Sequence, residues 1–148
     1  MIVVTLEGAV ALWRQILKII DIGYPICHLF AMPHTAAHTD TEATYAAIEV
    51  PAGVTYAPIQ LTQPPANWTF SSIGSGYQAQ YLNLQWVFTG AVTVYGYWIS
   101  DGTNTFSLWA ETFAGQFTYG AGGGVFNLLL TPWLASWPDV NSIPCSAP

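Results

Sequence analysis

Basic residues are almost absent from this chain. Arg14 and Lys18 are the only two in 148 residues, against eight acidic ones, and the formal net charge is −6. Proteins that bind nucleic acid need a cluster of positive charge to displace the counterions around phosphates. An anionic membrane surface attracts the same kind of cluster. We therefore expect neither nucleic acid nor a membrane as a partner.

The chain also lacks a long uninterrupted apolar run at its start. Glu7, Arg14 and Lys18 break the first twenty residues, and no basic residue precedes the apolar stretch. This pattern predicts neither a secretion signal nor a membrane span, so we expect the protein to be made and used without export. Only two cysteines occur, Cys27 and Cys145. Without export they are expected to be free thiols rather than a disulfide.

Charge of either sign is scarce, at 7% of the residues, whereas 52% are hydrophobic and 15% are aromatic. Ordinary soluble domains carry about 25% charged residues. Soluble monomers rarely leave large apolar patches open to water. We therefore expect part of the surface to be covered by further copies of the chain, as a dimer or trimer, or by another protein.

One amphipathic helix is predicted, over residues 7–20. Its apolar residues recur at three- and four-residue spacing, which is typical of a helix that packs on one side. Gly23 and Pro25 are expected to end it. The apolar stripe consists of Val10, Trp13, Leu17 and Ile20, and Arg14 and Lys18 lie on the remaining face.

The rest of the chain predicts short antiparallel strands separated by turns. A strand is expected over 24–31 and a turn or two of helix over 41–49. After Val54, runs rich in β-branched and aromatic residues alternate with turn signals, as in an all-β sandwich. The expected runs are 55–61, 67–73, 77–88, 91–100, 105–113 and 124–131. We expect a mainly β single domain over 1–148, with a helical arm (1–23), an antiparallel β-sandwich (24–140) and a C-terminal tail (141–148).

Several strands carry more specific signals. "VTVYGYWI" is apolar on both faces, so it is expected to be central or covered on both sides. "DGTN" is a hairpin signal, with Asp101 in the turn. Pro58 places its run at a sheet edge. Alternation puts Phe106, Leu108 and Ala110 on one face of their strand. The same pattern puts Phe126, Leu128 and Leu130 on one face of a later strand, opposite Asn127.

Five segments follow one another in an order that resembles a family of small structural proteins of tailed bacteriophages. They are "HLFAMPHTAAHTDTEATY", "YAPIQLTQPPANWTF", "WVFTGAVTVYGYWISD", "SLWAETF" and "LLLTPWLASW". The resemblance covers nearly the whole chain, and the "VYGYWISD…LWAETF" pairing is its most specific part. Other members tend to have "GD" before the last strand, where this chain has "GAGGG". The resemblance implies a jelly-roll-like β-sandwich with one N-terminal helix, in a capsid decoration (cement) protein or a small tail-associated protein.

Candidate catalytic and metal-binding residues are few. His34, His38 and Asp40 could hold a transition metal if they lay on one helix face, but Pro33 and the surrounding residues favour a polar loop. Cys27 and His28 are adjacent on a strand, so their side chains point to opposite faces and cannot act as a nucleophile and its base. We expect Cys27 to be a buried small residue.

Asp101 and Glu111 are the candidate pair of catalytic carboxylates in the predicted β region. In a glycosidase the two catalytic carboxyl groups lie about 5 to 10 Å apart. Asp101 is in the turn and Glu111 is expected at the far end of the next strand. With about 3.3 Å of rise per residue, the two are expected roughly 20 Å or more apart. The chain is therefore expected to be no enzyme and to bind no metal or cofactor.

Aromatic side chains are the expected means of binding, because Trp and Tyr are enriched at protein interfaces. We predict a decoration protein on the capsid surface of a virion, with the major capsid protein of that virion as its partner. The alternatives are a small tail- or fibre-associated adaptor, and a carbohydrate-binding module for host attachment. The predicted interface residues are Trp13, Arg14, Leu17, Trp98, Trp109, Trp133, Leu134 and Trp137.

Overall fold

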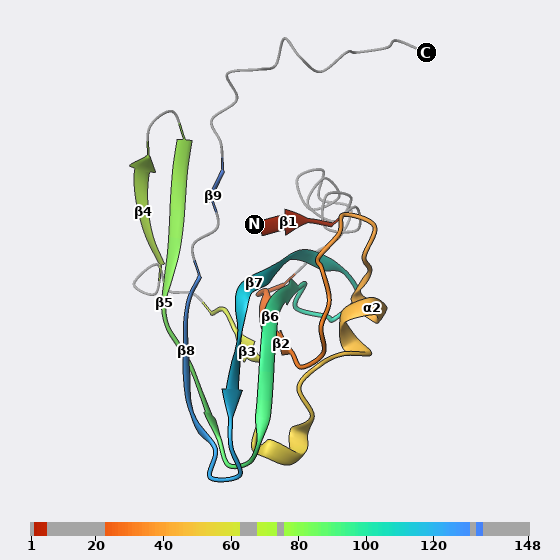
Figure 1. Ribbon diagram of the computed structural model, residues 1–148. Helices are drawn as coiled ribbons and strands as arrows, with labels where there is room; N and C mark the ends of the chain where they lie inside the picture. The colour runs from red at the N-terminus through yellow and green to blue at the C-terminus, as the bar shows by residue number, and fades with distance from the viewer. Residues whose placement is uncertain (1, 6–22, 63–67, 74–75, 131–132, 135–148) are drawn as a thin grey trace.

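The computed structural model describes residues 2–5, 23–62, 68–73, 76–130 and 133–134. These residues form two antiparallel β-sheets with little helix (Figure 1). The elements in chain order are β1 (Ile2–Val4), β2 (Ile26–Phe30), α2 (Glu42–Ala46), a 3₁₀ turn (Ala52–Val54), β3 (Ile59–Gln60), β4 (Trp68–Ile73), β5 (Gly76–Phe88), β6 (Val92–Ser100), β7 (Ser107–Tyr119), β8 (Gly124–Leu130) and β9 (Trp133–Leu134). The predicted helix over 7–20 lies outside the described residues.

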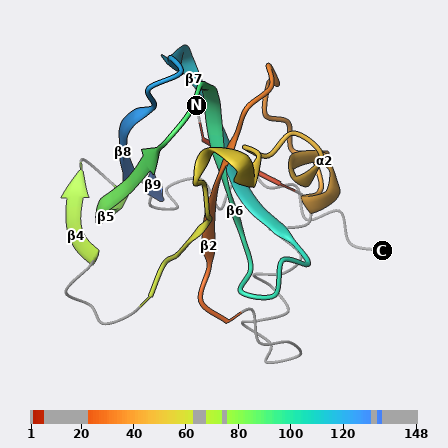
Figure 2. The ribbon, with the colours of Figure 1, turned by 90° about the horizontal axis from the view of Figure 1, so that it is seen from below.

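The first sheet has the strand order β1-β7-β6-β2-β3, and the second has the order β4-β5-β8 with β9 also paired to β5. The strand pair β6–β7 belongs to the first sheet and β5–β8 to the second, so the chain passes between sheets at the short connections after β5 and after β7. Figure 2 shows β4, β5 and β8 on one side of the molecule, β2 and β6 in the middle, and α2 on the opposite side.

The larger apolar core is built from both sheets. The first sheet contributes residues such as Leu29 and Ile99, and the second contributes residues such as Trp86, Phe126 and Leu130. All five are at most 4% exposed. Burying large apolar side chains of this kind contributes about 1.5 to 3 kcal/mol each, which makes this cluster the main source of stability.

A second, smaller core lies on the other face of the first sheet. Phe30, Trp98 and Ala110 of the sheet pack there with Tyr45 of α2, and all four have 0% exposure. The segment that includes α2 therefore covers the face of β6 that points away from the second sheet. This confirms that "VTVYGYWI" is a central strand covered on both sides, and it identifies the second cover as part of the same chain.

Most of the strand predictions are confirmed. The runs predicted over 24–31, 67–73, 77–88, 91–100 and 124–131 correspond to β2, β4, β5, β6 and β8. The turn of helix predicted within 41–49 is α2, which Thr41 begins with a capping box. The strand that follows Pro58, β3, is the outermost strand of its sheet. Phe126, Leu128 and Leu130 face the larger core, opposite the exposed Asn127.

Strand β7 differs from its prediction in two ways. It continues six residues beyond Phe113 to Tyr119, because its second half pairs with the first residues of β6. Glu111 therefore lies within the strand rather than at its far end, between Tyr97 of β6 and Ile2 of β1. An irregularity in pairing opposite Ile99 and Ser100 also breaks the two-residue alternation. As a result Leu108 packs in the larger core and Ala110 in the smaller one, and the prediction that they share a face was wrong.

Candidate protein-interaction surface

A buried polar network lies beneath the segment that covers the smaller core. His28 of β2 is 4% exposed and uses both ring nitrogens: Nδ1 is 2.9 Å from Glu49 Oε1, and Nε2 is 2.9 Å from Ser100 Oγ. Its ring stacks on the indole of Trp98, with the two centroids 4.3 Å apart. A polar side chain is tolerated in such a place because every hydrogen-bonding atom of the ring is satisfied. His28 is therefore part of the framework of the sheet.

Tyr56 ties the same network to the backbone of β2. Its hydroxyl donates to Glu49 Oε1 (2.9 Å) and accepts from the amide of Leu29 (2.9 Å). Burial raises the pKa of Tyr56, and the neighbouring charge of Glu49 adds to that increase. The hydroxyl is therefore held as a neutral donor and acceptor.

Tyr56→Phe is expected to lower the free energy of unfolding by about 2 kcal/mol, because the buried Leu29 amide would lose its acceptor. The measurement is urea-induced unfolding followed by tryptophan fluorescence. Tyr119→Phe is the matched control. Its hydroxyl also makes a hydrogen bond to the backbone, donating to the Val125 carbonyl, but this contact is exposed. The control is expected to cost no more than about 0.5 kcal/mol. Equal losses in the two variants would contradict this account of Tyr56.

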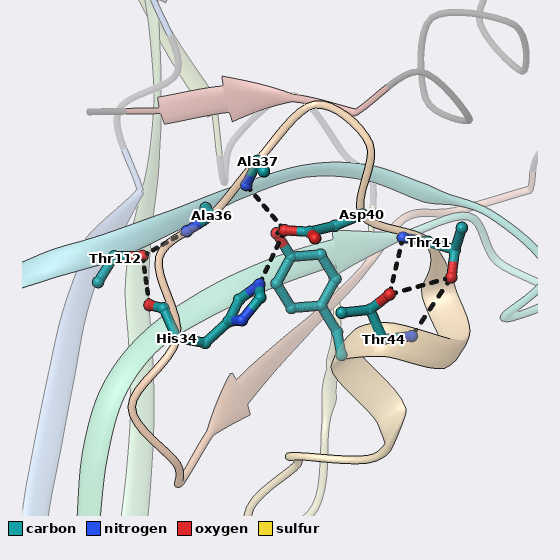
Figure 3. A network of polar contacts seen from close by, with 8 residues as sticks. His34, Ala36, Ala37, Asp40, Thr41, Thr44 and Thr112 are labelled. Atoms are coloured by element: carbon teal, nitrogen blue, oxygen red, sulfur yellow. Dashed lines mark hydrogen bonds and ion pairs between the residues drawn. The ribbon is translucent and has the colours of Figure 1, made fainter.

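A second polar cluster fixes the loop that precedes α2 (Figure 3). Asp40 Oδ2 accepts hydrogen bonds from His34 Nε2 (2.8 Å), the amide of Ala37 (2.7 Å) and the hydroxyl of Tyr45 (2.9 Å). Thr112 of β7 joins this loop to the sheet, since its hydroxyl donates to the His34 carbonyl and accepts from the Ala36 amide, both at 2.9 Å. The loop and α2 are thereby held against the smaller core.

Burial by itself would raise the pKa of Asp40, but the hydrogen bonds from His34, Ala37 and Tyr45, with the charge of His34, outweigh it and lower this pKa below 3.8. A lowered pKa in the folded state means that the ionised carboxylate adds stability above the unfolded-state pKa. That contribution is lost as the pH falls through the folded-state pKa. Acid should therefore weaken the attachment of the loop.

We expect Asp40→Asn to be less stable than the wild type at neutral pH, with the difference shrinking as the pH falls below about 4. The measurement is the free energy of unfolding of both proteins across the acid range. His38→Gln is the control, because His38 is an exposed neighbour outside this cluster. Its curve should follow the wild type. Parallel curves for the wild type and Asp40→Asn would contradict the role given to the carboxylate.

The residues considered for chemistry are drawn into these structural contacts. His34 and Asp40 bind each other, His38 is exposed, and within the described part of the chain no three His, Cys, Asp or Glu side chains are grouped to hold a metal ion. Cys27 packs in the larger core, on the face opposite His28, and its burial raises the pKa of the thiol.

The two carboxylates of the β6–β7 hairpin also have structural partners. Asp101 is 1% exposed and accepts hydrogen bonds from the amides of Thr105 (2.6 Å) and Phe106 (2.8 Å), which confirms its place in the turn. Glu111 accepts a hydrogen bond from the hydroxyl of Tyr97. Burial raises the pKa of Tyr97, and the charge and hydrogen bond of Glu111 raise it further.

Exposed apolar side chains gather on the outward face of the second sheet. Val125 and Leu129 of β8 are 48% and 56% exposed, and Val87 of β5, which pairs with Val125, is 55% exposed. Gln85 and Asn127 lie between them and share a hydrogen bond of 2.9 Å. We call these five residues the outer patch. The outer patch contains no charged group, so it is the candidate binding surface.

The predicted interface residues fall into four groups. Trp98 is fully buried between His28 and Tyr45, so its indole offers no surface to a partner. Trp109 is partly buried against the larger core. The backbone of Trp133 and Leu134 forms β9, which pairs with β5. Outside the described residues lie Trp13, Arg14, Leu17 and Trp137.

None of the five outer-patch residues was among the predicted interface residues, although the sequence pattern indicated that they are exposed. The alternation of β8 had already separated its inward and outward residues. The predicted interface residues were mostly tryptophans and did not include the aliphatic residues Val125 and Leu129. These two alternate along β8 with the residues that face the larger core, and this alternation was enough to predict that they are exposed. Aliphatic residues at outward positions of a strand therefore indicate exposed apolar surface in this chain.

No helix among the described residues is long and apolar enough to cross a membrane. Comparison with protein-family models, with curated proteins and with solved structures found no match to this chain.

Proposed function

We propose that this chain is a non-enzymatic structural protein of a tailed-bacteriophage virion, and specifically a capsid decoration (cement) protein. The observation that carries the proposal is the uncharged outer patch on the second sheet, in a chain with only 7% charged residues. We also propose that the two sheets form a β-sandwich of jelly-roll type, because the larger core draws on both of them. The resemblance of the "VYGYWISD…LWAETF" hairpin to phage structural proteins supports the same assignment.

A cement protein acts by binding the assembled lattice of the major capsid protein better than the free subunits. Each bound copy then favours the assembled state by mass action and raises the stability of the shell. Removing apolar side chains from water at an interface favours such binding. The outer patch supplies Val87, Val125 and Leu129 for this purpose. The protein would then be located on the capsid surface.

The polar side chains support a non-enzymatic role. Asp101 and Glu111 are both engaged within the β6–β7 hairpin, and His28 is buried with both ring nitrogens in use. A general acid or base must reach a substrate atom to act. These groups are committed to the framework instead.

A sugar-binding role receives less support than protein binding. Carbohydrate modules present flat aromatic rings to solvent, whereas the described tryptophan side chains, Trp86, Trp98 and Trp109, are buried or partly buried. Protein-interaction surfaces need no such platform. We therefore expect no quenching of tryptophan fluorescence when glycans are added.

Copy number in purified particles tests the proposal. A decoration protein should be present in hundreds of copies per virion, because it binds at each equivalent site of the shell. Quantitative mass spectrometry against the major capsid protein gives the ratio. A count of about a dozen or fewer would indicate a tail- or fibre-associated adaptor and would contradict the decoration role.

A further inference from the structure

Strand β8 is an edge strand whose sequence does nothing to prevent further pairing. Its neighbour is β5, and among the described residues no strand pairs with its other side. Its sequence, GVFNLLL, has no charged residue and no proline. Natural proteins usually protect edges with charges, proline, bulges or short strands. The edges at β1 and β3 are instead only three and two residues long.

The side chains of β8 divide cleanly between its two faces. Phe126 and Leu130 point into the larger core and are 3% and 0% exposed. Val125 and Leu129 point outward and are about half exposed, with the exposed Asn127 midway between them. The hydroxyl of Tyr119 donates to the Val125 carbonyl (3.1 Å) at the turn end of the strand. The strand runs from Gly124 to Leu130, so Asn127 is its midpoint.

We propose that β8 pairs antiparallel with β8 of a second copy of this chain, about a two-fold axis at Asn127. The two second sheets then form one continuous sheet across the dimer. A two-fold interface brings the same surface of both copies together, so it must be self-complementary. The sequence around Asn127 meets this condition.

The proposed register places compatible residues opposite one another on both faces. On the outer face Asn127 lies opposite its own copy, and Val125 lies opposite Leu129 of the second copy. On the inner face Phe126 lies opposite Leu128 of the second copy. Directly opposite side chains have Cβ atoms about 4.5 to 5.5 Å apart, close enough for the two asparagine amides to hydrogen-bond. No charge is placed against a like charge.

The same register favours a second copy of this chain, rather than an unrelated strand, as the partner of β8. The two outer patches meet side by side, because an axis perpendicular to a sheet keeps both outer faces on the same side. Each copy covers the exposed edge of the other, which a chain with 7% charged residues otherwise leaves open to water. The inference concerns self-association and holds whether or not the chain is a virion protein.

The first test measures the mass of the full-length protein by sedimentation as a function of concentration. The wild type is expected to be a dimer at micromolar concentration. Asn127→Lys should weaken the dimer at least tenfold, because two lysines would lie directly opposite each other. Gln85→Lys is the matched control: it adds the same charge to the same face and removes the same Gln85–Asn127 hydrogen bond, but one strand away from the edge. It should remain a dimer, and circular dichroism should show both variants folded.

The second test traps the register by disulfide formation in a Cys145→Ser background. Asn127→Cys should cross-link two copies on oxidation, since opposite residues of antiparallel strands have Cα atoms about 4.5 to 5.5 Å apart, within disulfide reach. Leu129→Cys alone should not, because its two copies would lie about 13 Å apart along the strands. Leu129→Cys mixed with Val125→Cys should cross-link.

Three results would overturn the proposal. The first is a wild-type protein that stays monomeric up to about 100 µM, which leaves the edge to a different partner or to none. The second is a dimer unaffected by Asn127→Lys, which places the interface elsewhere. The third is cross-linking of Leu129→Cys without cross-linking of Asn127→Cys, which excludes the register centred on Asn127.

Discussion

Gly96→Ala is expected to lower the free energy of unfolding by about 3 kcal/mol. Gly96 lies at the centre of β6, opposite Phe30 on one side and Thr112 on the other. A Cβ at this position would overlap the backbone carbonyl of Glu111 and the ring of Phe30. Neither can move easily, because the carbonyl belongs to a paired strand and Phe30 is fully buried with Trp98 and Tyr45.

Urea-induced unfolding of the purified variants provides the measurement, since both retain all tryptophans as probes. Gly115→Ala is the control: Gly115 also lies in a strand, β7, but a Cβ there would meet nothing within 4 Å. Its stability should change by no more than about 0.5 kcal/mol. If Gly96→Ala were as stable as Gly115→Ala, the packing of Phe30 against β6 would be wrong.

The second large effect is expected from Asp101→Ala, also about 3 kcal/mol, because four hydrogen bonds to one buried carboxylate would be lost at once. Oδ1 accepts from the amides of Thr105 and Phe106, and Oδ2 accepts from the amide (3.2 Å) and the hydroxyl of Thr103. These bonds close the turn between β6 and β7. The loss should therefore appear as global unfolding at lower denaturant concentration.

Asp101→Asn separates the two oxygens. Its single amide oxygen can keep one pair of donors, so the loss of stability is expected to be about half that of alanine. Thermal or urea unfolding of the three proteins gives the comparison. A wild-type midpoint for Asp101→Ala would show that the turn forms without the carboxylate, against the account given above.

Local signals predicted the parts of the fold that depend on local interactions. The Asp101 turn, the short helix α2 and the alternation of β8 each involve residues a few positions apart, so their geometry follows from the sequence pattern. The central position of β6 was also predictable, because both of its faces are apolar. What covers its second face was not, since a covering segment of the chain and a neighbouring copy leave the same pattern on the strand.

Features that depend on distant partners could not be predicted in the same way. His28 makes hydrogen-bond contacts with Glu49 and Ser100, which lie 21 and 72 residues further along the chain.

The second half of β7, with exposed residues such as Gln116, lacks the apolar alternation that marks a strand, and it is held by pairing with β6. The displaced pairing near Ile99 moved Leu108 to the same side as Trp109, which no two-residue period anticipates.

The candidate surface was likewise only partly predictable from the sequence. The low content of charged residues predicted that part of the surface is covered by further copies of the chain or by another protein. The structure places exposed aliphatic residues together on the outer patch. Trp98, which was predicted as an interface residue for its type, is held in the smaller core by α2. Residue type alone therefore did not separate core from exposed surface.

Binding to assembled capsid shells, compared with binding to free major capsid protein, tests the proposed function most directly. Purified protein is added to shells that lack it, and bound copies and the temperature of DNA release are measured. The account predicts saturable binding at hundreds of sites per shell, much weaker binding to free subunits, and a higher release temperature, because only preferential binding to the assembled state stabilises it. Equal binding to shells and free subunits, or an unchanged release temperature at saturation, would contradict it.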